Sequence, residues 1–166
     1  MLSKNIEKAL NLQIRIEAES SQIYLSMACW AEIHGLEGIA RFMFAQSDEE
    51  RVHMLKLIKF VNERGGHAQI TELKAPKTSF GTFRELFEEL YKHEIFVSDS
   101  INELVHISLT EKDYATHNFL QWYVAEQIEE EAQAKNILDK INLIGDDKGG
   151  LYLFDRDIQQ PATARP

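Results

Sequence analysis

The sequence predicts an all-α fold, a four-helix bundle with one long crossover connection and a short fifth helix at the C-terminal end. Apolar residues recur at helical spacing through four long segments, and the three prolines all fall outside those segments. The connection between the second and third segments is much longer than the others. The chain of 166 residues is long enough for one domain with a sizeable core. We expect that domain over residues 1–158, followed by a flexible tail over residues 159–166.

The first two helices are defined by glycine and capping signals at their ends. We expect the first over residues 5–34, with Ser3 or Asn5 as its N-cap and Gly35 directly after it. The second is expected over residues 36–64, because a Gly-Gly pair follows and stops it. The turn between these helices is short, so they should be antiparallel.

The third and fourth helices begin at residues whose side chains can accept a hydrogen bond from the first helical turn. Thr82 and Glu85 form a capping box at the start of a helix expected over residues 82–108. Asp113 is the expected N-cap of the fourth helix, which runs over residues 113–143. Only a short connection separates the two, so they should also be antiparallel.

Residues 65–81 form the long connection, which at about 17 residues exceeds what most compact domains use between helices. It can span the whole bundle, because a helix of roughly 26 to 31 residues is about 40–45 Å long. Such a crossover makes the second and third helices parallel. A final segment, residues 149–160, is long enough for two or three further helical turns.

Composition excludes several classes of protein. The net charge of −9 and the pI near 5.1 argue against a nucleic-acid-binding surface. The single cysteine, Cys29, excludes a disulfide framework and a cysteine-based zinc or iron–sulfur site within one chain. No segment approaches the roughly 18 apolar residues of a membrane span, and the first residues do not resemble a secretory leader. We therefore expect a cytoplasmic protein without nucleic-acid or membrane partners.

Each long helix places a polar, mostly acidic, side chain near its middle on an otherwise apolar stripe. In the first helix, Glu17 lies at seven-residue spacing between Leu10 and Tyr24. The equivalent polar positions on the other stripes are Glu50 and His53 in the second helix, Glu94 in the third, and Gln127 and Glu130 in the fourth. Buried carboxylates without basic partners are costly, and no lysine or arginine shares these stripes near mid-length.

A bound cation would explain this arrangement. Oxygen-rich ligation with one imidazole suits iron(II) or manganese better than copper, and zinc can also bind. Calcium is coordinated by oxygen atoms, so a histidine ligand argues against it. Each of these residues alone has an ordinary explanation. A glutamate can be solvated, His53 or Gln127 can be hydrogen-bonded in the core, and Tyr24 can be a packing residue. The alternative function is therefore a non-catalytic helical bundle, a structural or interaction protein whose buried polar residues set the register. The coincidence of four helices at compatible depth favours the metal site.

The sequence resembles the ferritins, and among them most closely the bacterial non-haem ferritins, over about residues 1–160. The matching residues are Glu17, Tyr24, Glu49-Glu50-x-x-His53, Glu94, Trp122 and Gln127-x-x-Glu130. The resemblance implies an iron-storage protein with ferroxidase activity. Such a protein oxidises Fe(II) with O2 or H2O2 and stores a ferric mineral inside a hollow shell of 24 identical subunits.

The resemblance also implies a role for each matching residue. The first iron would be held by Glu17, Glu50 and His53, with Glu50 bridging; the second by Glu94 and Glu130, with Gln127 close by; and a third beside the centre by Glu49, Glu126, Glu129 and Glu130. Tyr24 would lie within hydrogen-bond distance and give an electron during oxygen reduction. Leu151, Leu153 and Phe154 would provide apolar contacts between subunits.

Two departures separate the chain from the haem-binding relatives, the bacterioferritins. Their second E-x-x-H motif is absent, since the corresponding stretch is Gln127-Ile128-Glu129-Glu130. Their haem-ligating methionine follows the first E-x-x-H glutamate, where this chain has Arg51. We therefore expect no haem.

Overall fold

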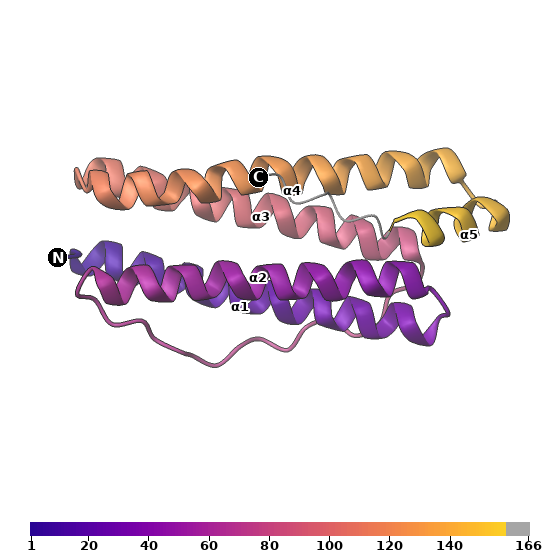
Figure 1. Cartoon of the computed structure of the whole chain (residues 1–166), viewed down its shortest axis with the longest axis horizontal. Helices are drawn as coiled ribbons and strands as arrows, with labels where there is room; N and C mark the ends of the chain where they lie inside the picture. Colours follow the sequence, from indigo (N-terminus) through magenta and orange to yellow (C-terminus); the bar gives the residue numbers. More distant parts are fainter. Residues whose placement is uncertain (159–166) are drawn as a thin grey trace.

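The computed structural model describes residues 1–158, so the tail expected over residues 159–166, and the last two residues of the segment expected over 149–160, lie outside the described residues. Within that part the chain forms five α-helices and no strands (Figure 1). They are α1 (Lys4–Ile33), α2 (Glu37–Glu63), α3 (Phe83–Thr110), α4 (Tyr114–Ile144) and α5 (Lys148–Asp157). The predicted all-α bundle is confirmed.

The helix ends follow the capping side chains that the sequence indicated. Ser3, rather than Asn5, caps α1, and Thr82 and Asp113 cap α3 and α4, each accepting a hydrogen bond from a backbone N–H in the first turn. The capping box at α3 departs from expectation in one respect. The Glu85 carboxylate accepts from the N–H of Gly81 at 2.8 Å, one residue before the cap.

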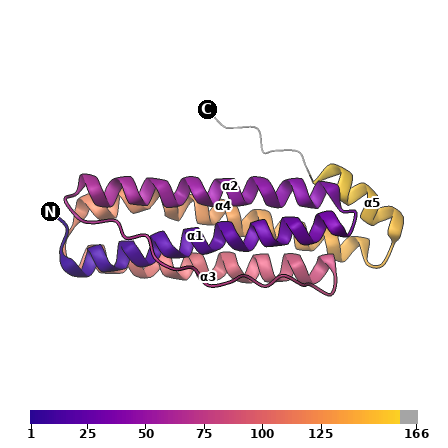
Figure 2. The same ribbon diagram turned by 90° about the horizontal axis from the view of Figure 1, so that it is seen from below.

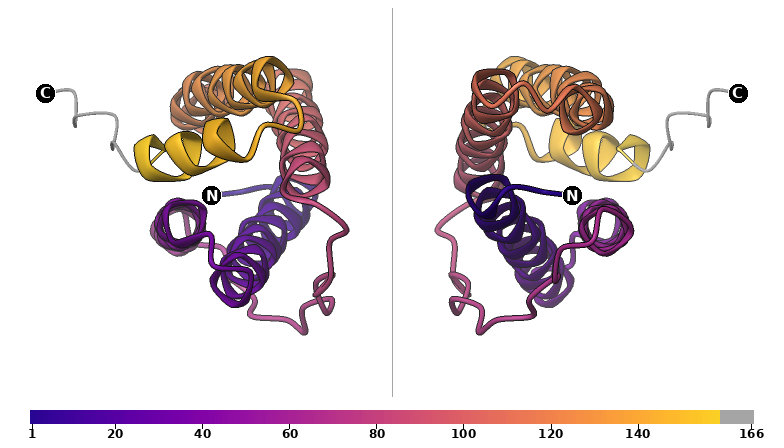
Figure 3. Two further views of the ribbon diagram at one scale, coloured as in Figure 1. Left: turned by 90° about the vertical axis from the view of Figure 1, so that its right-hand side faces the viewer. Right: turned by 90° about the vertical axis from the view of Figure 1, so that its left-hand side faces the viewer.

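The helices pair as two antiparallel hairpins, α1 with α2 and α3 with α4, joined by the crossover. Figure 2 shows the crossover running the length of the bundle beside α1, and the end views place it on the outside (Figure 3). Asn11 of α1 holds it by donating to the carbonyl of His67 at 3.0 Å and accepting from the N–H of Gln69 at 2.7 Å. Because the crossover spans the bundle, α2 and α3 are parallel, as predicted.

The short helix α5 closes one end of the bundle against α2 and α4 (Figure 1). Its Phe154 is buried and packs edge-on against Phe87, with the ring centroids 6.0 Å apart. Asp155 accepts a hydrogen bond from the N–H of Ile39 at 2.9 Å, which caps the start of α2 where its own N-cap residue has no side-chain bond. Phe154 is therefore part of the core of the chain itself, while Leu153 remains 47% exposed.

Two apolar clusters fill the bundle, one toward each end. The cluster at the α5 end includes Met27, Met43 and Phe87. The cluster at the other end includes Leu10, Leu57 and Ile101. The polar residues of the inner stripes lie between them, so the apolar core is divided by a polar layer at mid-length. No helix in residues 1–158 is long and apolar enough to cross a membrane.

Candidate metal centre

The polar layer draws one or two side chains from each long helix. Its members are Glu17 of α1, Glu50 and His53 of α2, Glu94 of α3, and Gln127 and Glu130 of α4. Each is at most 7% exposed. Side chains spaced seven residues apart lie close to one face of an α-helix. The polar side chains on the predicted apolar stripes therefore face the interior of the bundle, as expected. Four carboxyl groups are buried together.

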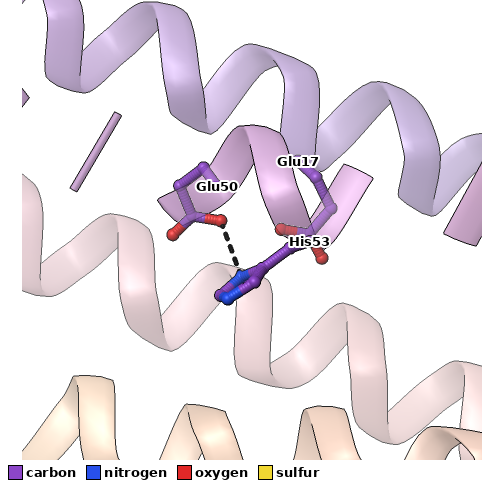
Figure 4. Close-up of side chains that lie close together, drawn as sticks. All are labelled: Glu17, Glu50 and His53. Carbon is purple, nitrogen blue, oxygen red and sulfur yellow. Dashed lines mark ion pairs between the residues drawn. The ribbon is translucent and has the colours of Figure 1, made fainter. Parts of the chain in front are cut away.

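One half of the layer comes from the first hairpin. Glu17, Glu50 and His53 each offer an atom such that all three lie within 4.8 Å of one another. Figure 4 shows the three side chains converging, with His53 Nδ1 3.2 Å from Glu50 Oε2. The Oε2 atoms of Glu17 and Glu50 are buried and accept no hydrogen bond, and the contact of Glu50 Oε2 with His53 is an ion pair only when the imidazole is protonated. Unsatisfied buried oxygens of this kind are rare, and an oxygen-binding cation would satisfy them.

The other half comes from the second hairpin. The Glu94 carboxylate accepts hydrogen bonds from the Tyr24 hydroxyl and, at 3.2 Å, from Gln127 Nε2. Glu130 Oε2 accepts from Gln46 Nε2 at 2.9 Å. Gln127 is therefore a polar neighbour of Glu94, and its closeness to a second iron, which the resemblance implies, stays a prediction. Tyr24 is fully buried, and burial together with the charge of Glu94 raises the pKa of its hydroxyl, so the phenol stays protonated.

Burial sets the protonation of the metal-free centre. It raises the pKa of Glu17 and Glu50 well above the ordinary range, and that of Glu94 in the same direction. For Glu130, burial and then the nearby charge of Glu94 raise the pKa to about 8. The cause is common to all four, because water cannot solvate their charges and the neighbouring carboxylates repel. A bound cation would reverse this balance and release protons.

A second group of ligand atoms lies on the outer side of His53. Glu49 and Glu126 each place an oxygen within 4.8 Å of a His53 ring nitrogen and of each other. Glu49 is exposed and Glu126 partly buried. The expected third site also included Glu129 and Glu130, but in residues 1–158 neither joins a three-residue group with these atoms. The geometry thus brings together half of that expected set and adds the histidine.

Several residues that contact the centre were not found from the sequence. Gln13 donates to Glu17, Gln46 donates to Glu130, and Lys56 places its ammonium 3.2 Å from the centroid of the Trp122 ring. The Trp122 ring in turn meets His53 edge-on at 5.2 Å. One signal could have found Gln13, which stands four residues before Glu17 on its own helix, in a Q-x-x-x-E pattern. Gln46 has the same spacing to Glu50 but bonds Glu130 on α4, so the pattern would have indicated the wrong partner.

Comparison with known proteins agrees with the fold and the site. Residues 7–144 match the ferritin-like domain family, and the chain belongs to the ferritins. The relatives that it resembles are bacterial non-haem ferritins. The chain is 47% identical over 165 residues to the bacterial non-heme ferritin of Campylobacter jejuni, with 99% of both chains covered. It is 40% identical over 158 residues to that of Escherichia coli O6:H1, covering 95% of this chain and 96% of the relative.

A solved structure is similarly close. The open-pore ferritin of the hyperthermophilic archaeon Archaeoglobus fulgidus superimposes with a TM-score of 0.95 at 42% identity. The match covers 96% of this chain and 99% of that chain. The ferritin fold therefore holds along nearly the whole sequence, the crossover and α5 included.

Proposed function

We propose that the protein is an iron-storage ferritin that oxidises Fe(II) at the buried polar layer. One observation carries this most strongly: Glu17 and Glu50 each leave a buried oxygen without a hydrogen bond beside His53. The alternative of a purely structural bundle does not explain these atoms, because a register-setting polar residue needs its hydrogen bonds satisfied. The named non-haem ferritin relatives support the same function.

The donor set suits two adjacent irons as substrate. Glu17, Glu50 and His53 would bind one Fe(II), and Glu94 and Glu130 the other, with Glu50 between them. Two Fe(II) ions give one electron each to O2, which takes up two protons and leaves as H2O2. With H2O2 as oxidant, the same two electrons and two protons give two waters. Hard carboxylate oxygens stabilise Fe(III) relative to Fe(II), which favours oxidation.

Buried carboxyl groups of the chain would release protons during this reaction. The four buried carboxyl groups have raised pKa values, so those that are protonated release protons as Fe(II) binds. The Tyr24 hydroxyl donates to Glu94 and so helps to hold that carboxylate in place. The electron that the family resemblance assigns to Tyr24 stays a prediction. The outer group around Glu49 and Glu126 would take a third iron, with Glu129 and Glu130 completing the set that the family resemblance implies.

Storage requires many copies of the chain. We propose a hollow shell of 24 subunits in the cytoplasm, with the ferric mineral inside it. A net charge of −9 per subunit gives the shell an acidic field that draws Fe(II) toward it. Arg51, exposed on α2, occupies the position of the bacterioferritin haem ligand, so no haem is proposed.

The direct test is aerobic oxidation of Fe(II) by the metal-free protein, followed by Fe(III) absorbance. Glu50→Ala and His53→Ala should each slow oxidation strongly, because they remove ligands to the first iron. Glu63→Ala is the matched control, since Glu63 is an exposed glutamate on the same helix. Oxidation by the two site variants at the wild-type rate would refute the ferroxidase proposal. Elution as a monomer or dimer on a sizing column would refute the shell.

A further inference from the structure

We propose that Gln13 and Gln46 are positioning residues of the metal centre. Each amide fixes one oxygen of a buried glutamate by donating a hydrogen bond, and so leaves the carboxylate turned to present its other oxygen to a metal ion. The proposal rests on the metal-binding function proposed above and adds to it the residues that hold the ligands in place. Neither glutamine belongs to the ligand set that the sequence suggested.

Gln13 holds Glu17 from one helical turn away. Its side chain is 1% exposed, and its Nε2 donates to Glu17 Oε1 at 2.9 Å. The other end of the amide is also fixed, because Ser100 of α3 donates its hydroxyl to Gln13 Oε1 at 2.7 Å. A flipped amide would turn its oxygen toward the Glu17 carboxylate and lose the bond to the ionised form, which can only accept. The ionised carboxylate therefore sets the direction of the amide, and the Ser100 hydroxyl holds its other end.

Gln46 holds Glu130 across the bundle. Its side chain is 5% exposed, and its Nε2 donates to Glu130 Oε2 at 2.9 Å. The two residues belong to different hairpins, since Gln46 lies on α2 and Glu130 on α4. The bond therefore ties a carboxylate of the second hairpin to α2, the helix that carries Glu50 and His53.

The two carboxylate oxygens of Glu17 differ in their contacts. At Glu17, Oε1 is held by Gln13, while Oε2 is buried and accepts no hydrogen bond. A lysine or arginine could hold the same oxygens, but its positive charge would repel the incoming cation. A neutral amide orients the ligand without that repulsion.

The test uses Zn²⁺ and Co²⁺, which report on the ligands without oxidation. We compare the metal-free wild type with Gln13→Met and Gln46→Met, variants of similar size that cannot donate. Each should bind Zn²⁺ at the buried site about 10–100-fold more weakly by calorimetric titration. The Co²⁺ ligand-field absorption should also change in shape, because a loosened carboxylate alters the coordination geometry. A merely structural glutamine would not alter this spectrum.

Two further variants make the test specific. Gln121→Met changes an exposed glutamine on α4 and should leave both Zn²⁺ affinity and the Co²⁺ spectrum as in the wild type. Ser100→Ala frees the far end of the Gln13 amide without touching a carboxylate of the centre. It should weaken Zn²⁺ binding in the same direction as Gln13→Met, but less.

Glu17→Ala separates failure of this proposal from failure of the metal site. If Glu17→Ala loses Zn²⁺ binding while Gln13→Met and Gln46→Met keep wild-type affinity and the wild-type Co²⁺ spectrum, the positioning role is wrong and the metal site stands. If Glu17→Ala binds Zn²⁺ as the wild type does, the buried centre itself is wrong. If the methionine variants instead lose thermal stability when metal-free but keep the Co²⁺ spectrum, the glutamines are structural and the proposal is overturned.

Discussion

The buried carboxyl groups of the polar layer lower the stability of the metal-free protein, and Glu130 illustrates this. Glu130 is 7% exposed, and burial and the charge of Glu94 raise its pKa from 4.5 to about 8. A carboxyl group that holds its proton more tightly in the folded protein opposes folding wherever the unfolded chain has already ionised. The layer is therefore a cost to the metal-free protein, and that cost depends on pH.

Between about pH 4.5 and 8, the unfolded chain has released the Glu130 proton while the folded protein keeps it, so the free energy of unfolding should fall as pH rises. Above that window both states are ionised and the effect is constant; below it both are protonated and the effect vanishes. Glu130→Gln removes this contribution. We expect its urea stability to vary less steeply with pH than that of the wild type, both measured metal-free. Parallel stability curves for the two proteins would contradict the assignment.

The sequence was sufficient to place Glu17, Glu50 and Glu94 on inner faces, because helical periodicity is a local property that a single chain reveals. It could not reveal the role of Gln46, whose partner Glu130 lies on another helix. A buried glutamine on an apolar stripe looks the same whether it bonds a backbone carbonyl or a carboxylate. The difference lies in which residue stands opposite on another helix, and only the packed structure supplies that.

Among the helices, α5 has a role that its own sequence did not indicate, since it caps the N-terminus of α2. We expected its apolar residues to serve contacts between subunits. The structure buries Phe154 in the bundle and uses Asp155 to cap the N-terminus of α2, while contacts between subunits through Leu151 and Leu153 stay a prediction. The expected bounds of the four long helices agree closely with the structure because glycines and capping side chains mark them. A cap supplied by another helix is non-local, so no local pattern could predict it.

Asp155→Ala should destabilise the protein by about 0.5–2 kcal/mol, the usual cost of losing an N-cap side chain. The loss arises because the Ile39 N–H loses its partner and the start of α2 loses a favourable negative charge. Chemical unfolding of the metal-free protein measures it. Asp157→Ala is the control, since Asp157 is exposed on the same helix and pairs with its neighbour Arg156. Equal stability of the two variants would show that the cap contributes nothing.

For the whole molecule, the polar layer separates two apolar clusters that would otherwise form one continuous core. A metal ion bound only by the folded protein shifts its stability by mass action. Bound cations would also neutralise buried carboxylates such as Glu17, whose pKa burial and the neighbouring charge of Glu50 raise in the metal-free protein. Removing metal should therefore affect the stability of the whole bundle rather than one loop.

We expect the thermal midpoint of the metal-free protein to rise when Zn²⁺ is added. The gain is about 2.7 kcal/mol at a free concentration of 100 times the dissociation constant. Differential scanning calorimetry with Zn²⁺ and with a chelator measures it. Glu17→Ala should show a much smaller shift, because it lacks one ligand of the buried group. A wild-type midpoint that does not respond to Zn²⁺ would contradict a metal site in the core.

The crossover also has a consequence for how the molecule comes together. It divides the chain into two helical hairpins, each closed by a short turn and local in sequence, and local contacts generally form early in folding. The first hairpin holds Glu17, Glu50 and His53, and the second holds Glu94, Gln127 and Glu130. Each hairpin thus holds half of the centre before the two halves meet. A ribosome releasing this chain completes the histidine-containing half first, while the partner that will enclose it is still being synthesised.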